Sequence, residues 1–213
     1  MIKIYSKKTT FKEIEKVIKT YYPSIKLKYK NYSKKYEQSG SIAYSKIKEN
    51  AIYYYGRINE YVILHELNHI LVNKSQKINS FSDQSFNKII KRLKKSFKDA
   101  EIPNMLYPLH IHEEYLVDKN VFKLNSLLIK PIIKEYILQS KKRKGFGLYC
   151  DFLTLSYLHK LSNSIGCKKE INIMKKKLPN KLINITNNLV LGKDVYNSYM
   201  GLLDEIDVGM MGG

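Results

Sequence analysis

Two histidines and a glutamate stand close together in the stretch YVILHELNHIL, residues 61–71. His65 and His69 are four residues apart, which on an α-helix places them about 40° apart in direction and about 6 Å apart along the axis. Both imidazoles can therefore reach one metal ion. Glu66 points about 100° away from His65, near such an ion but not necessarily bound to it. The pattern is the HExxH motif, in which two histidines bind zinc and the glutamate accepts a proton from the zinc-bound water.

The motif is informative because chance rarely produces it. A chain with 5 histidines in 213 residues and this glutamate content is expected to contain roughly 0.006 copies. The flanking residues, Tyr61 to Leu64 and Ile70 to Leu71, are uncharged and mostly apolar, as a buried active-site helix requires. The alternative is a helix whose two histidines lie at the surface and pair with Glu66.

A catalytic zinc ion normally has three protein ligands and one open position, so a third ligand is expected elsewhere. The segment HIHEEYLVDK contains several candidates. Glu114 and Asp118 are four residues apart, so they lie one turn apart on one face of an expected helix. Glu113 lacks an acid four residues later. His110 and His112 are alternative ligands, or residues that would stabilise the oxyanion of a transition state.

HExxH followed by ExxxD resembles the pattern of the gluzincin zinc metallopeptidases, and the order of elements is similar to that of minimal gluzincins and ImmA/IrrE-type peptidases. The resemblance implies a zincin-like fold with one Zn²⁺ bound by His65, His69 and Glu114. It also implies that Glu66 is the general base and that Asp118 supports a ligand histidine from behind.

The resemblance covers about residues 9–130 and includes the strand that precedes the HExxH helix. In such peptidases this strand borders the cleft and pairs with an extended substrate peptide. Tyr53, Tyr54 and Tyr55 occupy the matching place and are candidate substrate-pairing residues. The C-terminal stretch VGMMGG could lie in the cleft and keep the enzyme latent.

The elements expected around these motifs form an α+β fold. Four segments before Pro131 have apolar residues at helical spacing: 10–21, 58–72, 86–98 and 111–128. The same spacing predicts helices over most of the chain after Pro131. Strand patterns cover 25–32, 41–47 and 51–55. A small mixed β-sheet near the N-terminus therefore precedes the active-site helix and the glutamate helix. We expect a zincin-like metallopeptidase domain over residues 1–146 and a helical C-terminal extension, packed on it, over residues 147–213.

The formal net charge is +19, from 38 Lys and Arg against 19 Asp and Glu. Such a field attracts polyanions, so nucleic acid is a candidate partner. The alternative function is therefore a basic nucleic-acid-binding protein with a structural or absent metal. KLKYKNYSKKY, residues 26–36, interleaves lysine with tyrosine, which suits phosphate contact and base stacking. A strand with outward-facing lysines would give the same pattern.

Cys150 and Cys167 are too few for a disulfide framework and indicate two reduced thiols. No signal-peptide pattern begins the chain, and no apolar run reaches the roughly 18 residues of a membrane span. We therefore expect a cytoplasmic metalloprotease, a hydrolase that cleaves peptide bonds in a peptide or protein substrate, with a regulatory role.

Overall fold

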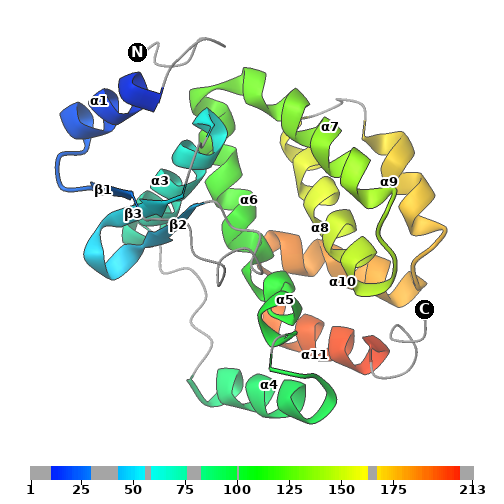
Figure 1. Ribbon diagram of the computed structural model, residues 1–213. Coiled ribbons are helices and arrows are strands. Elements are labelled where there is room, and N and C mark those ends of the chain that lie inside the picture. Colours follow the sequence, from blue (N-terminus) through cyan, green and yellow to red (C-terminus); the bar gives the residue numbers. More distant parts are fainter. Residues whose placement is uncertain are drawn as a thin grey trace. The chain divides into compact units, whose positions relative to one another are not determined.

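The computed structural model describes residues 11–29, 43–55, 59–75, 83–99, 101–162 and 167–206. The fold is α+β and mostly helical, with a small three-stranded mixed sheet near the N-terminus, as predicted (Figure 1). The chain divides into two compact units. Unit 1 comprises residues 1–78 and 117–126, and unit 2 comprises residues 79–116 and 127–213.

These units group the residues differently from the expected division between 146 and 147. Unit 2 already begins at residue 79, and helix α6, Tyr107–Leu124, begins in unit 2 and ends in unit 1. The residues of this helix are therefore divided between the two units. The peptidase domain expected over residues 1–146 stays a prediction.

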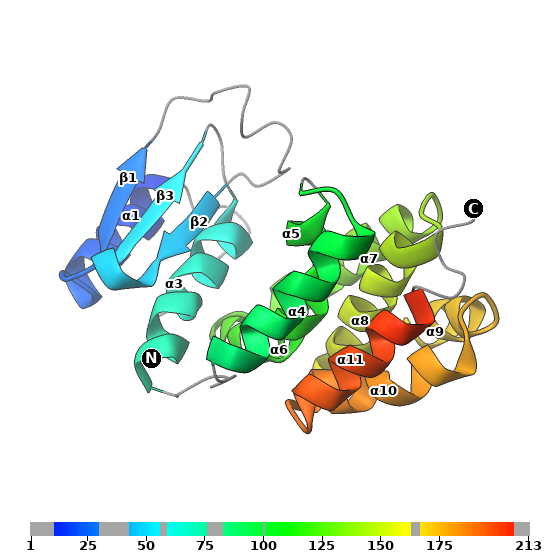
Figure 2. The ribbon, with the colours of Figure 1, turned by 90° about the horizontal axis from the view of Figure 1, so that it is seen from below.

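Unit 1 is built around the sheet. Its elements before α6 are α1 (Phe11–Tyr21), β1 (Lys26–Tyr29), β2 (Ala43–Lys46), the 3-10 helix η1 (Ile47–Glu49), β3 (Ala51–Tyr54) and α3 (Glu60–Ser75). The strand order is β1-β3-β2, with β3 parallel to β1 and antiparallel to β2 (Figure 2). Asn50, at φ +48°, turns the chain from η1 into β3. Asparagine tolerates this left-handed conformation better than most residues.

The core of unit 1 lies between α3 and the sheet. Helix α3 packs against β2 and β3 and also contacts α1. Ile63, Leu64 and Ile70 on α3, and Ile52 on β3, have no exposed surface. Burying these side chains fixes the orientation of α3, and with it the direction of the polar side chains on the same helix.

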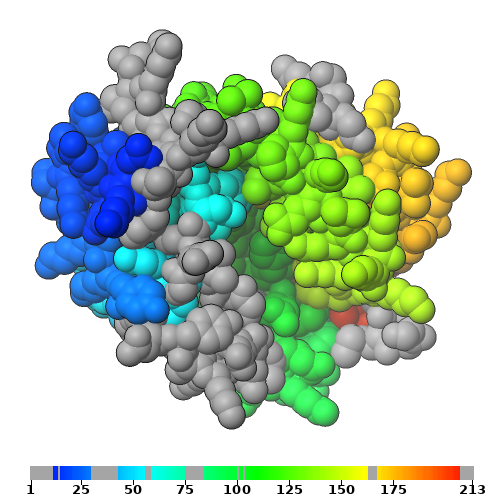
Figure 3. Space-filling view, turned by 45° about the horizontal axis from the view of Figure 1, so that its top comes forward, coloured from blue at the N-terminus to red at the C-terminus, as the bar shows by residue number. Residues whose placement is uncertain are grey.

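Unit 2 is helical. Besides the first part of α6 it contains α4 (Asp83–Ser96), α5 (Ile102–Met105), α7 (Ile129–Ser140), α8 (Gly145–Ser162), α9 (Lys168–Lys175), α10 (Asn180–Leu191) and α11 (Val195–Glu205), and the 3-10 helix η2 (Ser126–Leu128) joins α6 to α7. Helix α8 is central, because α7, α9 and α10 all pack against it. Helix α7 covers one side of α8 and forms much of the visible surface of this unit, in light green in Figure 3.

Two helices begin earlier than the sequence pattern predicts. Helix α6 starts at Tyr107 instead of residue 111, because Pro108 lies in its first turn, where no backbone N–H is needed. Helix α8 starts at Gly145, which has φ +53°, instead of residue 151. The sequence pattern predicts that a helix ends near Gly145. In the structure α7 ends at Ser140, and Gly145 begins α8.

Candidate metal centre

Helix α3 presents His65 and His69 on one side. The Asn59 side-chain oxygen accepts a hydrogen bond from the Val62 backbone N–H at 3.0 Å, so the first turn of the helix is capped. Leu67 is almost completely buried against the core, whereas both histidines are partly buried. The two imidazoles are therefore held by a rigid helix while part of each ring stays accessible.

The histidine rings meet as the HExxH spacing predicts. Their Nε2 atoms are 3.1 Å apart, and the rings stand nearly perpendicular, at 78° with centroids 4.8 Å apart. Two ligands of a tetrahedral zinc ion, each at about 2.0–2.1 Å from it, are about 3.3 Å apart. The separation of the two nitrogens therefore fits a shared metal ion.

Asp118 lies behind His65. Its carboxylate is completely buried, and its Oδ1 accepts a hydrogen bond from Nδ1 of His65 at 2.9 Å. A carboxylate can only accept here, so Nδ1 carries the proton and the lone pair of the neutral ring is on Nε2. This is the contact that the resemblance implied for Asp118, and it leaves Nε2 of His65 ready to bind a metal.

Glu114 completes the group. It precedes Asp118 by one turn on α6, and its carboxylate lies with the nitrogens of His65 and His69 in a cluster whose ligand atoms are all within 4.8 Å of one another. These three partly buried residues are therefore close enough to hold one metal ion.

Other candidates from the sequence do not join this group. Within the described residues, the metal-binding cluster consists of His65, His69 and Glu114, and Glu113, His110 and His112 lie outside it.

His112 has a different position. Its Nδ1 donates a hydrogen bond to the Val190 carbonyl at 2.8 Å, at the C-terminal end of α10. The next turn of chain passes Gly192, at φ +68°, so close to the His112 ring that a Cβ there would lie 2.6 Å from a ring carbon. His112 therefore helps to end α10, and the structure gives it a packing role inside unit 2.

Gly192→Ala should destabilise the protein by about 1–3 kcal/mol, because the left-handed backbone disfavours a Cβ and the methyl group would push against His112. Urea unfolding of the variant measures this difference. Gly201→Ala is the matched control, since a Cβ on Gly201 in α11 meets nothing within 4 Å. It should stabilise by roughly 0.5–1 kcal/mol through helix propensity. Equal effects of the two substitutions would contradict the proposed crowding.

The prediction that Tyr53, Tyr54 and Tyr55 pair with a substrate peptide is wrong. Strand β3 is the central strand of the sheet, with β1 hydrogen-bonded along one edge and β2 along the other. Tyr53 and Tyr54 each have a register partner on both sides, and Tyr55 follows the strand with a buried side chain. A central strand has no free edge for a further strand.

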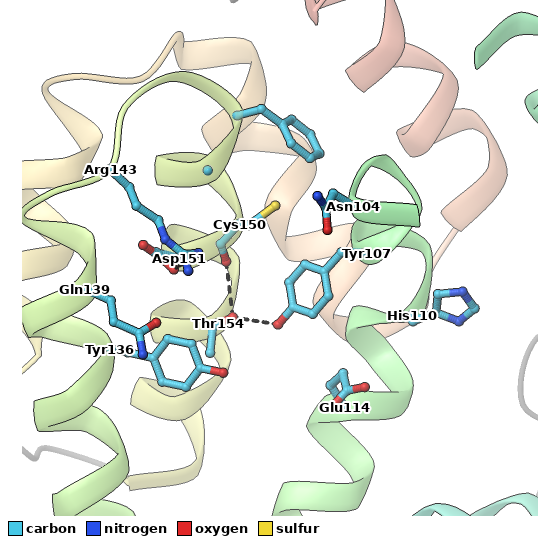
Figure 4. A pocket seen from close by; sticks show the side chains of 12 residues that line it. Asn104, Tyr107, His110, Glu114, Tyr136, Gln139, Arg143, Cys150, Asp151 and Thr154 are labelled. Carbon is cyan, nitrogen blue, oxygen red and sulfur yellow. Dashed lines mark hydrogen bonds and ion pairs between the residues drawn. The ribbon is translucent and has the colours of Figure 1, made fainter. Parts of the chain in front are cut away.

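Unit 2 contains a pocket of about 660 Å³, and Glu114 is one of the residues that line it (Figure 4). The walls come from α5, α6, α7 and α8. Tyr107 points across the pocket to Thr154, with the two hydroxyls 2.6 Å apart (Figure 4). Because the Thr154 hydroxyl donates to the Cys150 carbonyl at 3.1 Å, Tyr107 is the donor to Thr154. Burial also raises the pKa of Tyr107 well above its usual value, which keeps this hydroxyl protonated.

Asp151 and Arg143 form an ion pair on the pocket wall, with Arg143 Nη1 3.0 Å from Asp151 Oδ1. Asp151 is only 1% exposed. Burial raises its pKa to about 6, and the neighbouring Arg143 opposes this only in part. Neither this ion pair nor the pocket could be predicted from the sequence, because nothing in the spacing of the residues shows that α5, α6, α7 and α8 meet there.

The raised pKa of Asp151 predicts that the stability of the folded protein depends on pH. Since its pKa is about 6 in the fold against an ordinary 3.8, the folded chain holds a proton that the unfolded chain releases in this interval. Stability is therefore lost as pH rises from about 4 to about 6, by up to roughly 3 kcal/mol. Urea unfolding measures the free energy of unfolding of Asp151→Asn and of wild type. The difference, variant minus wild type, should be more positive at about pH 7.5 than at about pH 3.5. An equal difference at both pH values would contradict the raised pKa.

Comparison of the chain with protein-family models, with curated proteins and with solved structures finds no match in any of the three. The assignment of the site therefore depends on the residues and their geometry.

Cys150 and Cys167 are free, as predicted. Among the described helices, none combines the length and the apolar character that a membrane crossing requires.

Proposed function

We propose that the protein is a single-zinc metallopeptidase of the gluzincin type, with a zincin-like fold. The observation that carries this proposal is the cluster of two imidazoles and one carboxylate formed by His65, His69 and Glu114. Two nitrogens and one oxygen are a ligand set of catalytic zinc sites, which keep a fourth position open. Glu66 follows His65 directly on α3, as a general base in this motif must.

The roles of the residues follow from their positions. A zinc ion supplies a Lewis acid that polarises a peptide carbonyl and makes a water molecule acidic near neutral pH. His65 and His69 would bind it through Nε2, and Asp118 keeps His65 in the required tautomer. Glu66 would accept the proton of the attacking water and pass it to the leaving amine.

A regulatory role in the cytoplasm, on a peptide or protein substrate, belongs to this proposal and is supported by the sequence alone. The C-terminal stretch VGMMGG, which we expect to keep the enzyme latent, lies outside the described residues, as does most of the basic segment 26–36.

The metal content of the purified protein tests the proposal. Mass spectrometry should find about one zinc per chain in the wild type and in Glu113→Ala, and a loss of zinc in Glu114→Ala, since Glu114 alone of the two belongs to the cluster. Zinc retained by both variants would exclude Glu114 as a ligand and favour His110 or His112. A wild-type chain that takes up no zinc, even when zinc is added, would overturn the proposal.

Nucleic-acid binding is the second candidate function, and the surface of α4 favours it. Lys88, Lys91, Lys94 and Lys95 are exposed on this helix. Lysines spaced along one helix can contact successive phosphates, and such binding weakens steeply with salt. The test measures metal content and the affinity for a DNA duplex at different salt concentrations. A protein that binds no metal, and whose affinity for DNA falls steeply between about 50 and 200 mM salt, would favour nucleic-acid binding over the metallopeptidase proposal.

A further inference from the structure

Tyr61 contacts the acid that supports His65. It lies in the first turn of α3, four residues before His65 and therefore on the same side of the helix. Its hydroxyl donates to the Asp118 carboxylate, at 2.9 Å from Oδ1 and 3.1 Å from Oδ2. The three residues belong to unit 1, so their arrangement is internal to one compact body.

The Asp118 carboxylate depends on its donors because it has no exposed surface. A buried carboxylate without hydrogen bonds is costly and would favour another orientation or protonation. Oδ1 accepts from both Tyr61 and His65, and Oδ2 lies within reach of the same Tyr61 hydroxyl. A donor that reaches both oxygens restrains rotation of the carboxylate, which in turn restrains the His65 ring.

The Tyr61 ring is held from two sides. It stacks on Phe122 of α6, at 16° with centroids 6.3 Å apart, and lies tilted against His65, at 42° and 5.4 Å. Because the ring packs without help from the hydroxyl, phenylalanine at this position keeps the packing and removes only the hydrogen bond. The substitution therefore isolates the function of one oxygen atom.

We infer that Tyr61 is a positioning residue of the metal centre. Its hydroxyl orients Asp118 so that Nδ1 of His65 carries the proton and Nε2 faces His69. This role rests on the proposed function only where metal affinity is concerned, because the choice of His65 tautomer exists without any metal. Removal of a hydrogen-bond partner bonded directly to a metal ligand, as Asp118 is to His65, typically costs about 10–100-fold in metal affinity. The Tyr61 hydroxyl is one hydrogen bond further out, so its loss should cost less.

The test compares Tyr61→Phe with wild type in two measurements. In metal-free protein at about pH 8, ¹⁵N NMR of the imidazoles should show His65 as the Nδ1–H tautomer in wild type and as a mixture in the variant. In competition with a zinc chelator, the variant should bind zinc more weakly than wild type, by less than the roughly 100-fold upper value for a group bonded directly to a ligand.

Tyr199→Phe is the matched control. The Tyr199 hydroxyl is also buried and donates to the Met105 carbonyl at 2.7 Å, within unit 2. Its removal should lower stability while the zinc affinity and the His65 tautomer stay as in wild type. The same result for Tyr61→Phe would reduce Tyr61 to a stabilising residue and overturn the inference.

The two proposals fail in different ways. If the wild type binds no zinc, the peptidase proposal fails, while the tautomer measurement still decides the role of Tyr61. If the wild type binds zinc and Tyr61→Phe changes neither affinity nor tautomer, the peptidase proposal stands and the inference about Tyr61 is wrong.

Discussion

Glu66→Gln should lower peptide hydrolysis by about 10²–10⁴-fold while zinc remains bound. Glutamine has nearly the shape of glutamate, and Glu66 lies outside the cluster of candidate ligands, so the substitution removes only the proton acceptor. The measurement incubates zinc-loaded protein with a defined peptide library and quantifies the products by mass spectrometry. Zinc is determined in the same samples, so that loss of the base is distinguished from loss of the metal.

Glu113→Gln is the control for Glu66→Gln, since Glu113 is a partly buried glutamate outside the cluster. It should cleave the library at the wild-type rate. Unchanged hydrolysis by Glu66→Gln would contradict its assignment as general base. A wild-type protein that holds zinc and cleaves no member of the library would instead indicate a structural metal.

The second large effect is expected for His69→Ala, which should weaken zinc binding by more than about 100-fold. The reason is that His69 is one of the three candidate ligands found among the described residues. Loss of a ligand should cost more than the roughly 10–100-fold typical of a residue that only supports a ligand. Competition with a chelator of known zinc affinity measures the change. Urea unfolding of the metal-free variant shows that the fold is retained.

His110→Ala is the matched control for His69→Ala. His110 is exposed, lines the pocket of unit 2 and lies one turn before Glu114 on α6. Since it does not belong to the metal-binding cluster, its removal should leave zinc affinity unchanged. A large loss of affinity in His110→Ala would make this histidine a ligand and would require a different coordination from the one proposed.

Much of the architecture could be predicted from local patterns. The α+β class and the three strands near the N-terminus follow from alternating and helical repeats of apolar residues. The boundaries were less accurate where proline and glycine act at the beginning of a helix. Pro108 lies inside the first turn of α6, and Gly145 begins α8 with a left-handed backbone. A repeat of apolar residues does not distinguish these roles from the end of a helix.

The order of strands in the sheet could not be predicted. Each strand pattern is short and locally similar, and the chain enters the sheet as β1, β2 and then β3. In space β3 lies between the other two, which excludes Tyr53 and Tyr54 as residues that pair with a substrate. Strand order depends on hydrogen bonds between distant segments, and these leave no trace in the spacing of residues.

The spacing of four residues is enough to predict that His65 and His69 share one side of a helix and that Glu114 and Asp118 share one side of another. An α-helix fixes the relation between residues four apart, wherever the helix lies. The residues that meet these faces became known from the folded chain: Asp118 and Tyr61 contact His65, and Glu114 lies near both histidines. The folded chain also shows that His112 packs against Gly192 and lies outside the metal-binding cluster. Local geometry is set by the backbone, whereas partners across the fold are set by the burial of apolar faces that brings distant helices together.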